Sequence, residues 1–236
     1  MGIAGKTILI TGAAGGLGSA LALEFSKLGA ALILLDKNRR GLGALSDKIT
    51  DQGLAVPGLY PIDMAGAGPE DFKDLAATIG SEFGGLDVLV HCALEFESLQ
   101  PFEQIQPQEW LKSMQVNVNA PWLLSCLLLP LLKQSECGKL VFLLEDLSKV
   151  TGAYWGAYGT GKAALGGMVQ QFSESLSNTS VTVHGIIPGP MRTDFRAKVY
   201  HAENPLDQPD PQDKAKKIAK VLWEQNAENS LIVDLS

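Results

Sequence analysis

The chain has 236 residues, and 46% of them are hydrophobic, so it can bury a substantial core; we expect a single domain that spans residues 1–236. Its formal net charge of -7 argues against a general attraction to nucleic acid or to anionic membranes, because both are themselves negative. The expected partners are therefore small molecules and other protein chains.

Short runs rich in Val, Ile and Leu alternate along the chain with longer segments of helical spacing. Strands are expected at residues 7–10, 31–35, 54–62, 86–90, 139–144, 181–187 and 230–233, and helices at 18–27, 40–50, 69–83 and 163–176. Strands that alternate with helices pair in parallel through right-handed crossovers. We therefore expect an α/β fold: a Rossmann-type, doubly wound parallel sheet of about seven strands with helices on both faces. Ligands of such sheets bind beyond the carboxyl ends of the strands.

A glycine-rich segment, TGAAGGLG at residues 11–18, separates the first strand from the first helix. Gly12 permits a tight turn, Gly16 lets the backbone approach a pyrophosphate, and Gly18 allows close packing of the helix. The helix N-terminus that follows offers free N–H groups and the positive end of its dipole to phosphates. Glycines also gather in ordinary turns, but this position between strand and helix predicts a dinucleotide site.

Asp36 closes the second expected strand, where a carboxylate accepts hydrogen bonds from an adenosine ribose and repels a 2′-phosphate, which favours NAD(H). Lys37, Arg39 and Arg40 follow it. These cations can neutralise a phosphate if the loop curls back, so NADP(H) stays open as the alternative, and an ordinary solvated loop is the simpler interpretation. Asp63, after the third strand, either accepts a bond from the adenine amino group or starts a turn.

Tyr158 and Lys162 are four residues apart, on one face of an expected helix. Hydride transfer to a carbonyl leaves an alkoxide that must receive a proton, and a phenol with a pKa of ~10 is a poor base at neutral pH. A nearby ammonium favours the phenolate and corrects this. The spacing alone also fits an amphipathic helix surface, but beside the glycine loop it predicts a proton-transfer site.

The three cysteines, Cys92, Cys126 and Cys137, are widely spaced and contain no Cys-x-x-Cys pair, so neither a disulfide framework nor a metal site is indicated. Reduced thiols fit a cytoplasmic protein, and the N-terminal stretch lacks the pattern of a signal peptide, so we expect no export. The longest apolar run, residues 121–132, is shorter than the ~20 residues that cross a bilayer. It predicts a buried helix and no membrane span.

Four motifs together carry a resemblance to a known family: TGAAGGLG, VNVN at 116–119, YGTGK at 158–162 and PGPMRT at 188–193. With them the chain resembles the short-chain dehydrogenases/reductases over essentially its whole length, and it looks closest to a bacterial branch of poorly characterised oxidoreductases. The resemblance implies an NAD(P)-dependent oxidoreductase that transfers a hydride between a nicotinamide cofactor and a small carbonyl or alcohol substrate. It also implies a homodimer or homotetramer, to which the apolar helix can contribute a buried face.

The resemblance implies a role for each matching residue. Tyr158 would be the acid/base, Lys162 its partner and a donor to the ribose, and Asn117 the anchor of a proton-relay water. The other implied cofactor contacts are to the pyrophosphate (Gly12, Gly16, Leu17, Gly18), the ribose (Asp36), the adenine (Asp63) and the nicotinamide (Pro188, Gly189, Thr193). Residues 188–213, a long irregular stretch with five prolines, are expected to form a substrate lid or to be partly disordered.

Glu145 stands thirteen positions before Tyr158, where the family has a serine that hydrogen-bonds the substrate oxygen. A carboxylate ~4 Å from a phenolate costs ~4 kcal/mol at an effective dielectric of ~20, enough to undo what Lys162 contributes. Glu145 is therefore either a protonated donor in place of the serine, and a candidate catalytic residue, or paired with Lys162 or Lys149 and turned away. A rearranged loop that supplies Ser148 is the third arrangement.

A second departure is HCAL at residues 91–94, in place of the family's Asn-Asn-Ala-Gly. Leu94 adds bulk where glycine lets the backbone pass close to the cofactor, and it is expected to narrow the ribose pocket. His91 and Cys92 suggest a metal or nucleophile pair, but a buried cysteine is more often a small hydrophobe. Gly161, where the family usually has serine, is a third and milder change.

Three functions stay open: an active oxidoreductase, a dinucleotide-binding sensor or interaction partner without turnover, and a protein that has lost cofactor binding.

Overall fold

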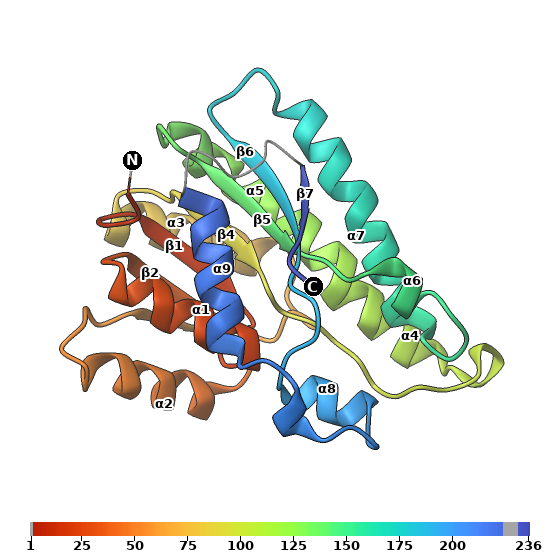
Figure 1. The fold of residues 1–236 in the computed structure, drawn as a ribbon. Helices are drawn as coiled ribbons and strands as arrows, with labels where there is room; N and C mark the ends of the chain where they lie inside the picture. The colour runs from red at the N-terminus through yellow and green to blue at the C-terminus, as the bar shows by residue number, and fades with distance from the viewer. Residues whose placement is uncertain (1, 224–230) are drawn as a thin grey trace.

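The structure, a computed structural model, describes residues 2–223 and 231–236, which form a parallel sheet with helices on both faces (Figure 1). The strands in these residues are β1 (Thr7–Thr11), β2 (Ala31–Asp36), β3 (Gly58–Pro61), β4 (Val88–His91), β5 (Lys139–Leu143), β6 (Thr182–Ile187) and β7 (Ile232–Asp234). The α-helices are α1 (Gly16–Lys27), α2 (Arg39–Thr50), α3 (Pro69–Phe83), α4 (Pro107–Met114), α5 (Ala120–Gln134), α6 (Leu147–Val150), α7 (Gly156–Ser175), α8 (Asp194–Val199) and α9 (Pro211–Trp223).

The strand order is β3-β2-β1-β4-β5-β6-β7, and every neighbouring pair is parallel. This confirms the expected seven-stranded, doubly wound sheet. The register places Thr11 opposite His91 and His91 opposite Phe142, so β1, β4 and β5 end side by side. The segments that follow these three strands, which include the glycine loop, Cys92 and Glu145, therefore meet at one edge of the sheet.

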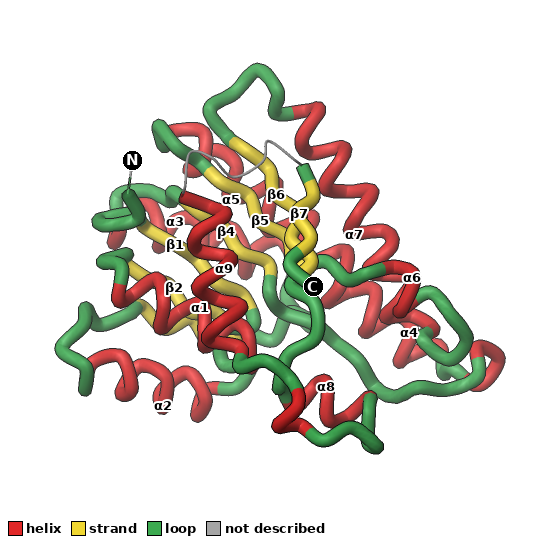
Figure 2. The backbone as a smooth tube through the Cα atoms, in the orientation of Figure 1, coloured by secondary structure: helices red, strands yellow, loops and turns green. Residues whose placement is uncertain are grey.

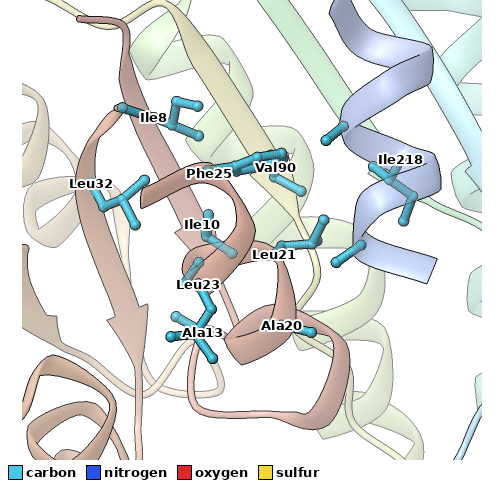
Figure 3. Packing of buried hydrophobic residues seen from close by; sticks show 14 of the residues in the cluster. Ile8, Ile10, Ala13, Ala20, Leu21, Leu23, Phe25, Leu32, Val90 and Ile218 are labelled. Carbon is cyan, nitrogen blue, oxygen red and sulfur yellow. The ribbon is translucent and has the colours of Figure 1, made fainter. Parts of the chain in front are cut away.

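Helices cover both faces of the sheet (Figure 2). Alternate residues of the strands enter two separate cores, one on each face. Ile8 and Ile10 of β1 pack on the face covered by α1 and α9, where Phe25 and Ile218 meet them (Figure 3). Leu9 points to the opposite face, against α3, α5 and α7. Because both faces are covered, the strands are almost continuously apolar, as parallel strands need to be.

The apolar helix is longer than the sequence indicates. A π-helical turn at Gln115–Asn119 joins α4 to α5 in one helix over Pro107–Gln134, which is long and apolar enough by length and composition to cross a membrane. Leu124 and Leu128 are fully buried in the core behind the sheet, so we interpret it as a core helix, although Trp122 is 52% exposed.

The expected lid is not irregular. Residues 188–213 contain α8, a 3₁₀ turn at Pro205–Asp207 and the start of α9. The Thr193 side chain begins α8 by accepting a hydrogen bond from the Arg196 N–H at 3.2 Å, and Asn204 caps the 3₁₀ turn in the same way. Pro205 and Pro211 stand at the first positions of the 3₁₀ turn and of α9, where proline fits. The last strand begins at Ile232, two residues later than expected, and Ser230 lies outside the described residues.

Candidate active site and dinucleotide cleft

A cavity of about 550 Å³ opens at the carboxyl ends of the strands. It is lined at one end by the glycine loop, Asp36 and Asp63, and at the other by Glu145, Trp155 and residues of α8. Leu17, Lys162, Pro188, Gly189 and Thr193 also line it. The fold therefore brings the expected cofactor residues together around one cleft of the size that a bound cofactor needs.

The glycine loop is packed too closely for side chains. Gly12 has φ +65°, and a Cβ there would lie 2.6 Å from the Ala93 Cα. A Cβ on Gly16 would lie 2.6 Å from the Thr193 Cγ2, and one on Gly18 would overlap the Gly12 carbonyl oxygen. The loop thus presents bare backbone and the start of α1 to the cavity, which fits a pyrophosphate.

Asp36 sits at the end of β2 with both carboxylate oxygens facing backbone amides. Its Oδ2 accepts from the Ala14 N–H at 3.0 Å and its Oδ1 from the Asn38 N–H at 2.8 Å. Asp63 lines the same end of the cavity, and its Oδ1 accepts from the Ala65 N–H at 3.0 Å, so it also starts a turn. These two carboxylates line the same end of the cavity, and their contacts to an adenosine stay a prediction.

Glu95, Lys37 and Lys112 form a buried ion-pair network beside this end of the cleft that the sequence does not indicate. Glu95 is 8% exposed and accepts from Lys37 Nζ at 3.0 Å and from Lys112 Nζ at 2.9 Å. Burial, the largest single influence, opposes its ionisation, but the hydrogen bonds and the charges of the two lysines together hold the pKa of Glu95 below its ordinary value. Lys37 is therefore already engaged, and nothing in the sequence pattern indicates that partners 58 and 17 residues away converge on Glu95.

Asn117 lies in the π-helical turn, a feature common at functional sites. Its Oδ1 accepts from the Glu95 N–H at 3.0 Å, and its Nδ2 donates to the Glu95 carbonyl at 2.8 Å and to Ser113 Oγ at 3.0 Å. Asn117 thus clamps the backbone that follows β4; its relay role stays a prediction. A Cβ on Gly161 would lie 3.1 Å from the Asn117 Cβ, a close contact, so a larger residue there would press on Asn117.

Tyr158 and Glu145 share a hydrogen bond. Tyr158 Oη donates to Glu145 Oε1 at 2.9 Å, so the carboxylate neither turns away nor pairs with Lys149, which lies 3.5 Å from Asp146. Burial, and after it the Glu145 carboxylate, raises the pKa of Tyr158 well above 10. The phenol is therefore held in its protonated form. Ser148 donates its hydroxyl to Asp146, and the loop is not rearranged to place it beside Tyr158.

Lys162 lies on the floor of the cavity, 6% exposed, one helical turn beyond Tyr158. Its ammonium donates to the Leu143 carbonyl at 2.9 Å and lies 5.6 Å from the centre of the Tyr158 ring. Burial lowers the pKa of Lys162, while the charge of Glu145 raises it in part. The expected pair of the Tyr158 phenol and the Lys162 ammonium is present, and the Glu145 carboxylate lies beside it.

Glu145, and not Tyr158, lines the main cavity among the residues that the structure describes. Tyr158 is 2% exposed and lines a neighbouring cavity of about 30 Å³ together with Phe96. Its ring packs edge-on against Phe96 and near Phe195, with centroids 5.6 and 5.2 Å away. The carboxylate of Glu145 therefore faces the main cavity, and the phenol lies behind it.

The HCAL segment is packed rather than reactive. His91 is buried, stacks on Phe142 and hydrogen-bonds Ser125 Oγ through Nε2 at 2.8 Å, and burial lowers its pKa to about 3. Burial raises the pKa of Cys92 to about 12, so the thiol stays protonated, as a small hydrophobe would. Leu94 lines the cavity and packs against the aromatic cluster around Tyr158.

Comparison with known proteins agrees with this geometry. A sequence model of the short chain dehydrogenases matches residues 6–204. The chain belongs to the short-chain dehydrogenase/reductase family. Members of this family act on CH–OH and carbonyl groups, so the chain is an oxidoreductase by descent.

Relatives place the chain in a bacterial branch of the family. It is 34% identical over 208 residues to an uncharacterised oxidoreductase, YciK, of Escherichia coli K12, a match that covers 88% of this chain and 82% of the relative. A solved short-chain dehydrogenase of Shigella flexneri, complexed with NADP, is 30% identical with a TM-score of 0.91 over 97% of this chain and 95% of that one. Another, from Escherichia coli CFT073 and complexed with NADPH, is 31% identical with a TM-score of 0.92 over 98% and 96%.

Proposed function

We propose that this family member is an NAD(P)-dependent oxidoreductase that transfers a hydride between the nicotinamide and a small organic substrate bound between Glu145 and α8. The observation that carries the proposal is the retention of a glycine cradle and Lys162 in one cleft, with the buried Tyr158 beside them behind Glu145. The cofactor, when bound, supplies or accepts the hydride.

The chain's own residues would hold the cofactor and manage the proton. The backbone at Gly12, Gly16 and Leu17 offers the pyrophosphate its amides, and Asp36 faces the adenosine ribose. Pro188 and Gly189 shape the nicotinamide end of the cleft. Tyr158 contacts the cavity through Glu145, so in a reaction that needs a proton from the phenol, that proton would pass by way of the carboxyl group.

We further propose that NAD(H) binds more tightly than NADP(H), although the solved relatives named above hold NADP(H). The support is that Asp36 lines the end of the cavity proposed for the ribose, while Lys37, the next residue in the chain, is paired with Glu95. Titration of both nucleotides tests this, and Asp36→Asn should improve NADPH binding relative to NADH. Equal or tighter binding of NADPH by the unaltered protein would reverse the proposal.

Turnover is tested by following the absorbance of NADH or NADPH with a panel of carbonyl and imine compounds, using the unaltered protein and Lys162→Met. Substrate-dependent oxidation of the cofactor that is lost in Lys162→Met supports the proposal. No turnover by the unaltered protein and none by Glu145→Ser would reject it.

A second function, a dinucleotide-binding protein without appreciable turnover, is favoured by one observation. Tyr158 gives its hydrogen to Glu145 and not to the cavity. Saturable nucleotide binding with no turnover on any compound of the panel would support a sensor or an interaction partner. We also propose a cytoplasmic homodimer or homotetramer, which light scattering of the purified protein can test.

A further inference from the structure

We infer that the group reduced in this site is a protonated carbon–nitrogen double bond, an iminium, rather than a neutral carbonyl. The inference rests on the proposed function and names the substrate class of the same cavity. It departs from the usual chemistry of the family because Glu145 stands where the family presents a hydroxyl.

The position of the Glu145 carboxylate decides which reacting atom fits. It lies at the cavity wall, while Tyr158 behind it is 2% exposed and donates its hydrogen to Glu145 Oε1 at 2.9 Å. A substrate atom beside the nicotinamide would thus meet an acceptor that already draws a hydrogen bond from the phenol. A carbonyl oxygen can only accept hydrogen bonds and is repelled there, whereas an iminium N–H donates one and brings an opposite charge.

The surroundings of the carboxylate leave room for a ligand cation. Lys162 donates to the Leu143 carbonyl and Lys149 pairs with Asp146. On α8, Arg196 makes two bonds of 2.7 Å to Glu203. Lys149 and Arg196 are paired with carboxylates of their own, and the charge of the Lys162 ammonium is the one that acts on Glu145. A cationic substrate can add a further positive charge on the side of Glu145 that faces the cavity.

Aromatic rings also line the cavity. Trp155 and Phe195 line the cavity, with the Trp155 ring 5.8 Å and the Phe195 ring 5.2 Å from that of Tyr158. Aromatic faces attract cations and pack against flat apolar rings. A cyclic iminium of one or two rings combines the charge that Glu145 favours with the surface that these side chains bury.

Reduction of an iminium does not require Tyr158 to release a proton, as the electron balance shows. The iminium carbon gains a hydride from the reduced nicotinamide nucleotide, and the π pair of the C=N bond becomes the lone pair of the nitrogen. The N–H bond is kept, the products are a neutral amine and the oxidised nucleotide, and no proton has to leave the phenol. Reduction of a carbonyl would instead place a new negative charge beside Glu145.

The test compares matched substrates in the full chain: dihydroisoquinoline, a cyclic imine that protonates readily, and tetralone, a ketone of similar shape. The unaltered protein should reduce the imine with a kcat/KM about tenfold or more above that for the ketone. Glu145→Gln, which keeps the shape and removes the charge, should lose this preference, and Glu145→Ser should reverse it. Glu103→Gln, an exposed glutamate outside the cavity, is the matched control and should keep it.

A binding measurement gives a readout independent of turnover. In calorimetry with NAD⁺ or NADP⁺ present, protonated tetrahydroisoquinoline should bind about tenfold more tightly than neutral isochroman, and Glu145→Gln should abolish the difference. Reduction of the ketone in preference to the imine, or equal binding of the two ring compounds, would overturn the inference and leave the proposed function standing. Failure of both nicotinamide nucleotides to bind would overturn the proposed function and the inference with it.

Discussion

Glu145 and Tyr158 share one hydrogen, and this contact sets the pH behaviour of the site. Burial is the larger cause of the raised Tyr158 pKa, and the Glu145 charge adds to it. Glu145→Gln should therefore lower the pKa of the phenol but leave it above 10. Ultraviolet titration of phenolate absorbance, corrected with a Tyr158→Phe variant, measures it. Because phenolate forms at lower pH in the variant, alcohol oxidation should gain its alkaline activity at lower pH; an unchanged titration would show that the carboxylate does not act on the phenol.

The side chain of Asn117 holds the backbone of Glu95 through two hydrogen bonds, so its removal should lower the stability of the fold. Asn117→Ala would leave the buried N–H and carbonyl of Glu95 without their side-chain partner, which should lower the free energy of unfolding by about 1–3 kcal/mol. Urea denaturation measures the change. Asn119→Ala, at a more exposed position of the same turn, is the control and should cost less. Equal losses in the two variants would contradict the assignment of Asn117 as the clamp.

His91 joins three elements, because it ends β4, stacks on Phe142 of β5 and hydrogen-bonds Ser125 of α5. Burial lowers its pKa from 6.5 to about 3, so the unfolded chain binds a proton in this range that the folded chain does not. Stability should therefore fall as the pH drops from 6.5 towards 3. His91→Phe should flatten this fall when unfolding is followed at several pH values; an equally steep fall in the variant would assign it to other groups.

The elements that carry short, local patterns were predictable, and those that depend on distant partners were not. The glycine loop, Asp36 and the Tyr158–Lys162 pair are each recognisable within a few residues. The structure brings the loop, Asp36 and Lys162 to one cleft, and it places Tyr158 behind Glu145. The π-helical turn and the network at Glu95 depend on contacts between residues far apart in sequence. Sequence spacing indicated a carboxylate near the phenol, but not that it stands between the phenol and the cavity.

Several large apolar side chains are exposed on the surface of the molecule. Trp122 of α5 is 52% exposed and Leu111 of α4 is 66% exposed. If these helices form the subunit interface, Trp122→Lys should shift the protein to a smaller species in light scattering, with the circular dichroism spectrum unchanged. Leu206→Lys, at a residue that is 76% exposed and lies outside α4 and α5, should leave the mass as it was. A monomeric unaltered protein would contradict the expected homodimer or homotetramer.

Residues that follow strands in both halves of the sheet line the dinucleotide cleft. One titration tests most directly whether a nucleotide binds there. NADH and NADPH are added to the unaltered protein and to Gly16→Val while tryptophan fluorescence is recorded, since Trp155 lines the cavity. We expect saturable binding by the unaltered protein and its loss in Gly16→Val, because a side chain at Gly16 would meet Thr193 in the cradle. The absence of saturable binding of either nucleotide, or unchanged binding in Gly16→Val, would contradict the account.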